Sequence, residues 1–465
     1  MRPNNVQISR IFWTGICLGA VLSAAHLTKE SGPTQEISFA LHGAAPSDGR
    51  GYSAPNVGVS SQNLDRLIEL KRYSEFERQL PSATLSEADR RYFEGVLADR
   101  LNQPSHAIKL LEKALPELTK SDRKRAAVAL YALAENYFMV GRYAEATTQY
   151  AVLLERFDHF LDYEERRTAR DNHDTFALLG NATPQSISGE RSFKLTTRRD
   201  PLGDLEVPVN VGANNEWWIW DTGANISTIT KSTAKRLGLT VSKGHAQTLG
   251  GATGTEVSLS TAIIPELTFG GAIVHNVVVL VMDDKELNIN LGTQGAYQIN
   301  GILGYPVLAA MQTFIVERGE MQVGLSKSAS ARTTRLYVDE MTPLVAASSG
   351  SESLIFQFDT GNSGADLTAR FLKRFPREFA SLKSERGQFG GAGGTKTVTI
   401  YRLPELELSF GSATAKFKNI TLFDGDRGEL LDKLFGNLGQ GLLDQFQSYT
   451  VDFTGMEITF GDPAR

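Results

Sequence analysis

The sequence predicts a multi-domain protein in which an all-α helical module precedes a mainly β region built from two similar halves. Three observations predict this fold class. Apolar residues recur with a helical period between about residues 63 and 157. From Phe193 onward, short alternating runs separated by Gly, Asn and Asp are typical of strands and turns. Within that β region, a series of motifs occurs twice, in the same order and at nearly equal spacing.

Composition and charge limit the function classes. The 465 residues allow roughly two to four domains. Hydrophobic content of 41% and charged content of 22% are ordinary for a soluble globular protein. The net charge of −5, without a long Lys/Arg run, argues against a nucleic-acid partner. The single cysteine, Cys17, lies in an N-terminal apolar stretch, so the rest of the chain offers no disulfide framework or cysteine nucleophile.

Residues 1–25 are typical of an export signal, either a cleaved signal peptide or an N-terminal anchor. A basic start precedes a mostly apolar run, and Leu22-Ser23-Ala24 offers a small-residue cleavage site. The apolar run is shorter than the roughly 20 residues of a membrane span. An uncleaved anchor in residues 11–25 stays open, and only then do we expect a membrane contact. In both cases the bulk of the chain is expected to be exported, to a periplasmic or extracellular location.

Residues 26–60 are rich in Gly, Pro, Ser and Ala and predict a flexible linker. Residues 61–160 predict a helical domain. Its clearest part, ALYALAENYFMVGRYAEATTQYAVLLERF, has two apolar faces on either side of Gly141. These faces carry Leu130, Leu133, Ala134 and Tyr137, then Tyr143, Ala146, Tyr150 and Leu153.

The order of small and large residues in that helical pair resembles a tetratricopeptide repeat. The stretch Arg91–Pro116 resembles a degenerate copy before it, and Asn63–Gln79 suggests a third hairpin. A plain helical bundle is the alternative. Either fold predicts a module that binds a protein partner or positions a substrate rather than one that carries chemistry. Residues 161–190, which are charged and lack a clear face, predict a tail helix and linker.

Two copies of Asp-Thr-Gly mark the candidate site. In WWIWDTGANISTIT, a bulky apolar run stops at Asp221, and a β-branched run follows. In LIFQFDTGNSG, Asp359 again follows an apolar run, 138 residues later. Each pattern predicts a buried strand, a tight turn with a carboxylate, and a second strand. Two carboxylates on matching strand–turn elements are what a paired-aspartate site requires.

Further motifs repeat after each aspartate. A glycine-rich hairpin candidate comes first, as LGGATGT and then FGGAGGT. A Pro-Glu-Leu element follows, with its proline 44 residues after Asp221 and 45 after Asp359. Gly304 and Gly439 then fall at 83 and 80, and each copy ends in a similar hairpin, FIVERGEMQVGLS and YTVDFTGMEITFG. The repetition therefore divides the β region into residues 191–328 and residues 332–465.

The two copies resemble the lobes of a pepsin-type, retropepsin-like aspartic protease, and the resemblance covers roughly Phe193 to the C-terminus. It implies that Asp221 and Asp359 are catalytic and that the lobes meet around them. The supporting residues would be Thr222, Gly223, Thr360 and Gly361, with the threonines bonding across the interface. The triplet Ile302-Leu303-Gly304 and its partner Leu438-Gly439 would pack beneath the catalytic loops. The glycine-rich hairpins would be flaps that bind substrate, through Gly250, Gly251, Ala252, Thr253, Gly254, Gly390, Gly391, Ala392 and Gly393.

Several residues depart from the pepsin pattern. Both lobes carry a glycine-rich hairpin, and the first lacks the usual flap tyrosine, so the pair resembles a retroviral homodimer fused into one chain. Asn437 stands where an apolar residue is typical, which suggests looser packing on that side. Ala224 cannot donate a hydrogen bond to a catalytic carboxylate, and Asn362 either donates one or points elsewhere. With at least one donor missing, we expect the dyad to hold its proton to higher pH and activity to lie at mildly acidic to near-neutral pH.

The predicted function is an exported aspartic endopeptidase that hydrolyses polypeptides with a water activated by the dyad. No cofactor or metal is expected, because the seven histidines lack metal-ligand spacing and the fifth position of Asp424–Gly428 is glycine. A serine protease is rejected because Ser363 directly follows the second Asp-Thr-Gly. The alternative is a catalytically silent peptide-binding or scaffold protein that retains the cleft. If the helical module is an independent repeat domain with its own buried core, residues 193–465 are expected to fold without the helices.

Overall fold

The computed structural model describes residues 8–10, 59–250, 255–291, 295–324, 330–391, 394–425 and 433–464. Most of the predicted signal and linker therefore lies outside the described residues. So do six of the predicted flap residues and part of the Asp424–Gly428 turn. Of the nine predicted flap residues, those outside are Gly251, Ala252, Thr253, Gly254, Ala392 and Gly393.

The N-terminal part is all-helical, as predicted. It comprises α1 (Ser61–Glu69), α2 (Tyr73–Gln79), α3 (Glu87–Arg100), α4 (Pro104–Ser121), α5 (Arg123–Met139), α6 (Tyr143–Arg156) and α7 (Tyr163–Ala177), with short 3-10 turns at Leu80–Ser82 and Asp158–Phe160. Consecutive helices from α3 to α7 contact one another. All eight apolar positions predicted around Gly141 are buried. Among the described residues, no helix is long and apolar enough to span a bilayer.

Small residues allow the helices to pack closely. A Cβ on Gly95 of α3 would lie 2.7 Å from the Leu111 side chain of α4. Ala134 of α5 and Ala146 of α6 are both fully buried. Gly141, with φ of +76°, takes the left-handed conformation that a turn between helices requires.

The helical region extends to Ala177, beyond the predicted boundary at residue 160. The stretch assigned to a tail helix and linker contains all of α7, which begins with a capping box between Asp162 and Glu165. Phe176 near its end stacks on Phe138 of α5, with ring centroids 4.4 Å apart. Charged residues on the outer face masked this apolar anchor in the sequence pattern.

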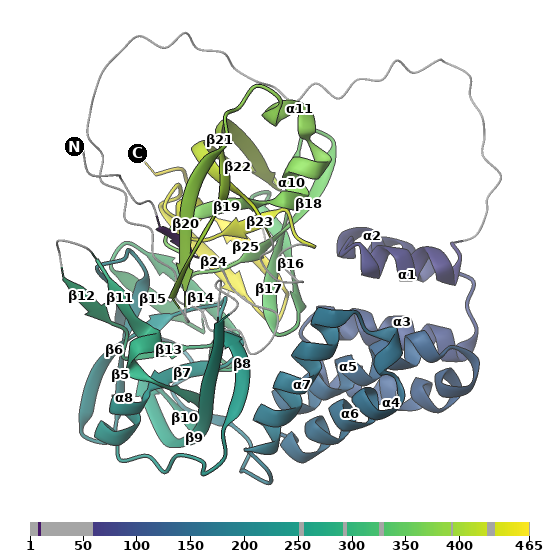
Figure 1. The fold of residues 1–465 in the computed structure, drawn as a ribbon, viewed down its shortest axis with the longest axis horizontal. Coiled ribbons are helices and arrows are strands. Elements are labelled where there is room, and N and C mark those ends of the chain that lie inside the picture. Colours follow the sequence, from purple (N-terminus) through teal and green to yellow (C-terminus); the bar gives the residue numbers. More distant parts are fainter. Residues whose placement is uncertain are drawn as a thin grey trace.

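The C-terminal part is β-rich, as predicted, and Figure 1 shows it beside the helices. One nine-stranded sheet in the described part has the order β2-β10-β7-β13-β6-β5-β9-β8, with β4 at its side. Its strands are β2 (Ser186–Gly189), β4 (Arg198–Arg199), β5 (Leu205–Val211), β6 (Asn214–Trp220), β7 (Ser227–Thr230), β8 (Ala246–Gly250), β9 (Thr255–Phe269), β10 (Ala272–Met282) and β13 (Gly301–Leu303). A separate pair joins β11 (Asn288–Asn290) to β12 (Ala296–Gln298).

A second set of strands follows the same local plan. It comprises β16 (Thr333–Asp339), β17 (Thr342–Ser349), β18 (Glu352–Phe358), β19 (Ala365–Thr368), β20 (Glu385–Gly391), β21 (Gly394–Phe410), β22 (Ala413–Asp424) and β23 (Gly436–Leu438). In the first set, β13 lies parallel to β6 and antiparallel to β7. In the second, β23 lies parallel to β18 and antiparallel to β19. Each short central strand is thus held between the strands that flank one Asp-Thr-Gly.

The two sets are joined by the repeated terminal hairpins. β14 (Thr313–Glu317) and β15 (Glu320–Val323) form one hairpin, and β24 (Ser448–Asp452) and β25 (Glu457–Phe460) form the other. β14 pairs antiparallel with β24, with Ile315 opposite Thr450. β3 (Phe193–Thr196) adds to β15, and β16 adds to β25. At the far edge of the connected strands, β1 (Ile8–Arg10) pairs with β20.

Within the described ranges, five short helices connect the strands. They are α8 (Lys231–Arg236), α9 (Tyr305–Ala310), α10 (Ala369–Arg374), α11 (Pro376–Phe379) and α13 (Gln440–Leu443), and a 3-10 turn spans Asp284–Leu287.

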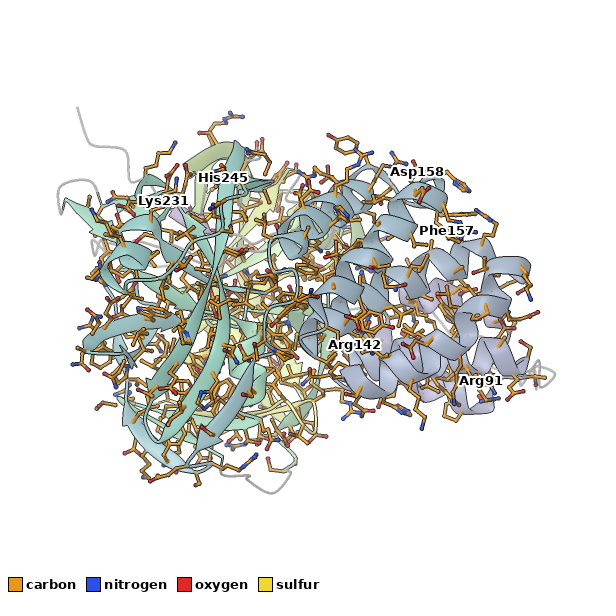
Figure 2. All side chains as sticks on the ribbon, turned by 90° about the horizontal axis from the view of Figure 1, so that it is seen from below. Arg91, Arg142, Phe157, Asp158, Lys231 and His245 are labelled. Carbon is orange, nitrogen blue, oxygen red and sulfur yellow. The ribbon has the colours of Figure 1, made fainter. Side chains whose placement is uncertain are left out.

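The helical region packs directly on the β-rich part, and Figure 2 shows their side chains meeting along one flank. Asp339, at the end of β16, is 2% exposed and contacts Lys71, Tyr73 and Arg100 of the helices. Arg100 lies 2.9 Å from this carboxylate. Asn102 donates a hydrogen bond to the Phe453 carbonyl at 3.0 Å. The two parts therefore share a buried interface, and folding of residues 193–465 without the helices stays a prediction that removal of this interface would test.

Candidate active site

Asp221 and Asp359 each stand directly after a buried strand. The last residues of β6 and of β18 are fully buried, so each turn rests on a rigid apolar support. The Asp221 amide donates a hydrogen bond to the Leu303 carbonyl at 3.1 Å, and the Asp359 amide donates one to Leu438 at 3.0 Å. Each aspartate is thereby fastened to the short central strand of its own set.

Two buried threonines connect the aspartate turns. Thr222 Oγ1 donates to the Phe358 carbonyl at 2.8 Å and accepts from the Thr360 amide at 3.0 Å. Thr360 Oγ1 donates to the Trp220 carbonyl at 2.6 Å and accepts from the Thr222 amide at 3.0 Å. These four reciprocal bonds tie both turns into one unit, because each hydroxyl bridges to the backbone of the other half.

The carboxylates face one another across this unit. A Cβ on Gly223 would lie 2.5 Å from Asp359 Oδ1, and a Cβ on Gly361 would overlap the Asp221 carboxylate. Glycine is therefore required at both positions by the opposite aspartate. The Gly223 amide also donates to Asp221 Oδ1 at 2.7 Å, and the Gly361 amide donates to Asp359 Oδ1 at 3.1 Å.

The surroundings of the two aspartates raise their pKa values to different extents. Both are fully buried. Burial raises the pKa of Asp221 to about 6, against the opposing effect of the Gly223 amide and a hydrogen bond from Asp359. Burial, together with the Asp221 charge, raises the pKa of Asp359 well above its usual range. One proton is therefore held on Asp359 while Asp221 is ionised near neutral pH.

Asn437 contributes a third polar group to the pair. It is fully buried at the centre of β23, and its Nδ2 donates to Asp359 Oδ2 at 2.7 Å. This bond favours the ionised form of Asp359 and opposes part of the rise in its pKa. The expectation of looser packing at Asn437 is thus corrected, because the amide fills the site and bonds to the dyad. Ile302, its counterpart in β13, offers no such donor.

The residues after the two glycines supply no side-chain donor. Ala224 is fully buried and carries only a methyl group. Asn362 is also buried, but its Nδ2 faces Asp366 at 3.4 Å and its Oδ1 accepts from the Gly364 amide at 2.9 Å. Of the two orientations considered for Asn362, the structure shows the one that points away from the carboxylates.

A family model for aspartyl proteases matches residues 207–307 of the chain. The chain contains an aspartic protease-like domain. The match includes Asp221, the first glycine-rich hairpin and Ile302-Leu303-Gly304. Among curated proteins, none matches the chain.

Two solved structures resemble parts of the chain. Basic 7S globulin from soybean is 10% identical with a TM-score of 0.36, covering 58% of this chain and 94% of that one. A retropepsin-like aspartic protease from Rickettsia conorii is 15% identical with a TM-score of 0.19, covering 30% of this chain and 94% of that one.

Close packing beneath the turns keeps the aspartic protease-like domain rigid at its site. A Cβ on Gly304 would lie 2.5 Å from the Ile226 backbone, and one on Gly439 would overlap the Asn362 carbonyl. Trp218 and Trp220 are fully buried in the core. Trp217 is only partly buried and lies against Arg198, whose guanidinium carbon is 4.3 Å from the ring centroid.

Three of the predicted flap residues lie in described strands of the β-rich part. Gly250 ends β8 opposite Thr255, and Gly391 ends β20 opposite Gly394, with Gly390 one residue earlier. The described ends of the two glycine-rich segments therefore lie in the paired strands of antiparallel hairpins, β8–β9 and β20–β21. Within the described ranges, no group of three or more His, Cys, Asp or Glu side chains is placed to hold a metal.

The sequence pattern did not reveal two polar groups of this site. The Gln440 Nε2 donates to the Thr360 carbonyl at 2.6 Å. Asp204 is fully buried, and its charge adds to the raised pKa of Asp359. The sequence drew attention to one other polar group of the site, Asn437, because it stands where an apolar residue is expected.

Proposed function

We propose that the protein is an exported aspartic endopeptidase that hydrolyses polypeptides at the Asp221–Asp359 pair. The observation that supports this most is that the two buried carboxyls face each other. General acid–base hydrolysis requires one proton shared between two acids of unequal pKa, and this pair provides it. The two sets of strands are proposed to be the lobes of a bilobal protease. Their reciprocal threonine bonds support the view that the pair forms within one chain.

The unequal pKa values assign the proton-transfer roles. Ionised Asp221 removes a proton from a water molecule, and the resulting hydroxyl attacks the peptide carbonyl carbon. Asp359 gives its proton to the carbonyl oxygen, so the intermediate is a neutral diol. Asp221 then protonates the departing nitrogen while Asp359 takes back a hydroxyl proton, and the C–N bond breaks. Because both carboxyls are buried, the covering segments must move before a substrate reaches them.

The sequence of the N-terminal parts of the chain suggests roles in export and in binding a partner. Residues 1–25 are proposed to direct export, or to anchor the chain if they are not cleaved. The helical region is proposed to consist of tetratricopeptide-like repeats that bind a protein partner. The small buried residues at Gly95, Ala134 and Ala146 support this, since they allow the close helix pairs that such repeats need.

Cleavage of a denatured protein tests the proposal. The full chain is incubated with fluorescently labelled denatured casein across acidic to neutral pH, with and without pepstatin. We expect cleavage that pepstatin inhibits. Asp221→Asn and Asp359→Asn are each expected to abolish it, because neither carboxylate alone can both remove and donate a proton.

Circular dichroism and thermal unfolding of both variants serve as the control for folding. Near-normal turnover by Asp359→Asn would show that the two halves do not share one intramolecular pair. A folded wild-type chain that leaves casein intact at every pH, yet binds peptides, would instead support the catalytically silent alternative.

A further inference from the structure

A cavity of about 440 Å³ lies between the helical region and the tip of the β16–β17 hairpin. Helices α1, α3, α5 and α7 contribute to its wall, and Asp339 and Glu340 enter from the hairpin. Among the described residues, eight acidic and five basic side chains line it, so acid is in excess there. Its volume falls within the roughly 300–1,000 Å³ typical of small-molecule sites.

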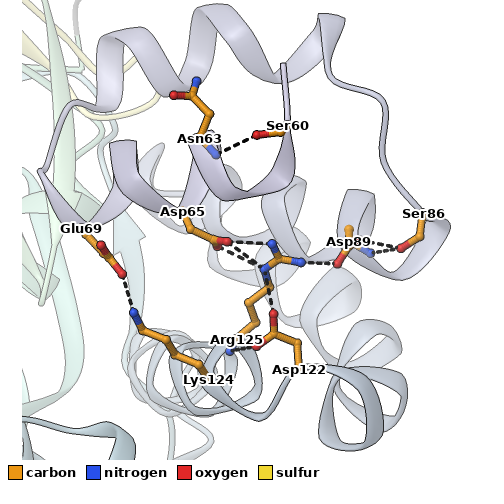
Figure 3. Close-up of polar contacts among 9 residues, drawn as sticks. All are labelled: Ser60, Asn63, Asp65, Glu69, Ser86, Asp89, Asp122, Lys124 and Arg125. Carbon is orange, nitrogen blue, oxygen red and sulfur yellow. Dashed lines mark hydrogen bonds and ion pairs between the residues drawn. The ribbon is translucent and has the colours of Figure 1, made fainter. Parts of the chain in front are cut away.

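The basic side chains of the wall already have acidic partners. Figure 3 shows Arg125 between Asp65 at 2.7 Å and Asp89 at 2.5 Å, and Lys124 paired with Glu69 at 2.5 Å. Lys71 and Arg100 both contact Asp339, and Lys433 lies 3.5 Å from Glu165. Among the described residues, each basic side chain of the wall thus forms its ion pair with an acid other than Glu135 or Glu340.

Glu135 and Glu340 each have a buried carboxylate oxygen. Glu135 of α5 is only 4% exposed, and its Oε1 is buried without a hydrogen-bond partner among the described residues. The Oε2 of Glu340 is buried in the same way, again counting the described part of the chain. Both side chains line the cavity. Leaving buried carboxylate oxygens unpaired is costly, so an occupant that pairs with them would be stabilised.

The hairpin turn places Glu340 at the cavity although its backbone conformation is unfavourable. Glu340 and Met341 form a two-residue turn with φ of +52° and +55°. Both residues thus adopt the left-handed conformation that such turns normally give to Gly, Asn or Asp. Strain of this kind persists where the surrounding structure fixes the side chain, and here Met341 is 3% exposed.

We propose that this cavity binds the ammonium or guanidinium group of an alkyl chain, with Glu135 and Glu340 as its charge partners. Tyr92 and Tyr131 also line the wall and offer aromatic rings against which such a cation can pack. A metal ion fits less well, because no three ligating side chains in the described ranges are grouped to hold one. This site is separate from the aspartate pair and does not rest on peptidase activity.

Binding should release protons. Burial raises the pKa of Glu340 to about 7, and burial raises that of Glu135 well above its usual range. Asp99, Arg100 and Asp339 face Glu135, and Glu340 also lies near it. Lys71, Asp339, Lys433 and Glu165 face Glu340. A bound cation favours the ionised forms, so affinity rises as pH rises through neutrality.

Isothermal titration calorimetry of the full chain with agmatine and spermidine tests the site, at about pH 6.5 and about pH 8. We expect binding that is at least about tenfold tighter at the higher pH, with proton release seen as a dependence on buffer ionisation enthalpy. Glu135→Gln and Glu340→Gln should each weaken binding by about tenfold or more. Glu155→Gln, on the exposed face of α6 and away from the cavity, is the matched control and should bind as wild type.

Glutamine resembles a protonated glutamate, so both variants should keep the wild-type melting temperature, and Glu340→Gln carries the test if Glu135→Gln does not fold. A lysine-containing peptide that binds more tightly than spermidine would identify a polypeptide as the source of the cation. Absence of binding, equal affinity in Glu340→Gln, or tighter binding of calcium ions would each overturn the proposal.

Discussion

Replacing Asn437 with Leu should move one side of the activity profile and leave the other in place. The substitution keeps a side chain of similar size in a fully buried position and removes the amide that donates to Asp359 Oδ2 at 2.7 Å. Since that donor favours ionised Asp359, its loss raises the Asp359 pKa. The pair is active with one proton, so the alkaline limb of the profile marks the loss of the proton from Asp359.

The size of the shift follows from the strength of one bond. A hydrogen bond to a charged group contributes about 1.5–3 kcal/mol, and one pKa unit corresponds to about 1.36 kcal/mol. The alkaline limb should therefore move up by about 1–2 pH units. The acid limb reports Asp221, whose pKa is about 6 and which has no bond to Asn437, so it should stay where it is.

The assay is kcat/KM against pH for a quenched fluorescent peptide, measured for wild type and Asn437→Leu. Ile302→Asn provides the mirror experiment, because it places an amide at the matching position of the first half and should move the acid limb downward. An alkaline limb that stays in place or moves to lower pH in Asn437→Leu would refute the assignment of Asn437 to the acidity of Asp359. Thermal unfolding checks that neither variant has lost its fold.

Three further predictions concern Ala224, the buried Asp339 and removal of the helical region. Ala224→Ser should lower the Asp221 pKa by adding a donor, which moves the acid limb of the peptide-cleavage profile down by about one unit; a wild-type optimum below about pH 3.5 would contradict the underlying reasoning. Asp339→Asn should destabilise the chain by roughly 3–5 kcal/mol in urea unfolding, because Lys71 stays buried without its ion-pair partner and Arg100 keeps only Asp99. Burial opposes ionisation of Asp339, but the charges of Arg100 and Lys71 outweigh burial and hold its pKa at about 2, below the ordinary 3.8. The stabilisation from this lowered pKa, about 2 kcal/mol, is therefore present above about pH 4 and is lost as pH falls toward 2. A chain that begins at residue 186 should show lower solubility and a lower melting temperature than the full chain, since loss of the helices exposes Asp339 and Tyr337; equal melting temperatures would show that the interface adds nothing to stability.

The sequence predicted those parts of the fold and the site that depend on the residue pattern of a short segment. The helical period gave the buried faces of α5 and α6, and the repeated Asp-Thr-Gly gave the two facing carboxylates. The donor on Asp359 could not be read in this way, because Asn437 lies 78 residues from it and meets it only through the pairing of β18 with β23. The unusual polar residue was visible, but its partner was not.

The same limit applies to the docking of the helices. Asp339 looks like an ordinary hairpin residue, and its contacts with Lys71 and Arg100 cross more than half of the chain. For a related reason, the sequence predicted a tail helix after residue 160 but not its packing against the other helices. α7 is anchored mainly by Phe176 on Phe138, and one aromatic residue among many charges leaves a weak amphipathic signal.

The pairing of β14 with β24 also sets an order on folding during synthesis. Phe314 lies opposite Val451, so the first half cannot complete this sheet until Val451 has left the ribosome. The turn at Asp221 likewise waits for Phe358 and Thr360 before its threonine bonds exist. A nascent or truncated chain therefore carries one aspartate turn without its counterpart. If the pair is the hydrolytic centre, such a chain cannot hydrolyse other polypeptides until its second half has emerged and folded against the first.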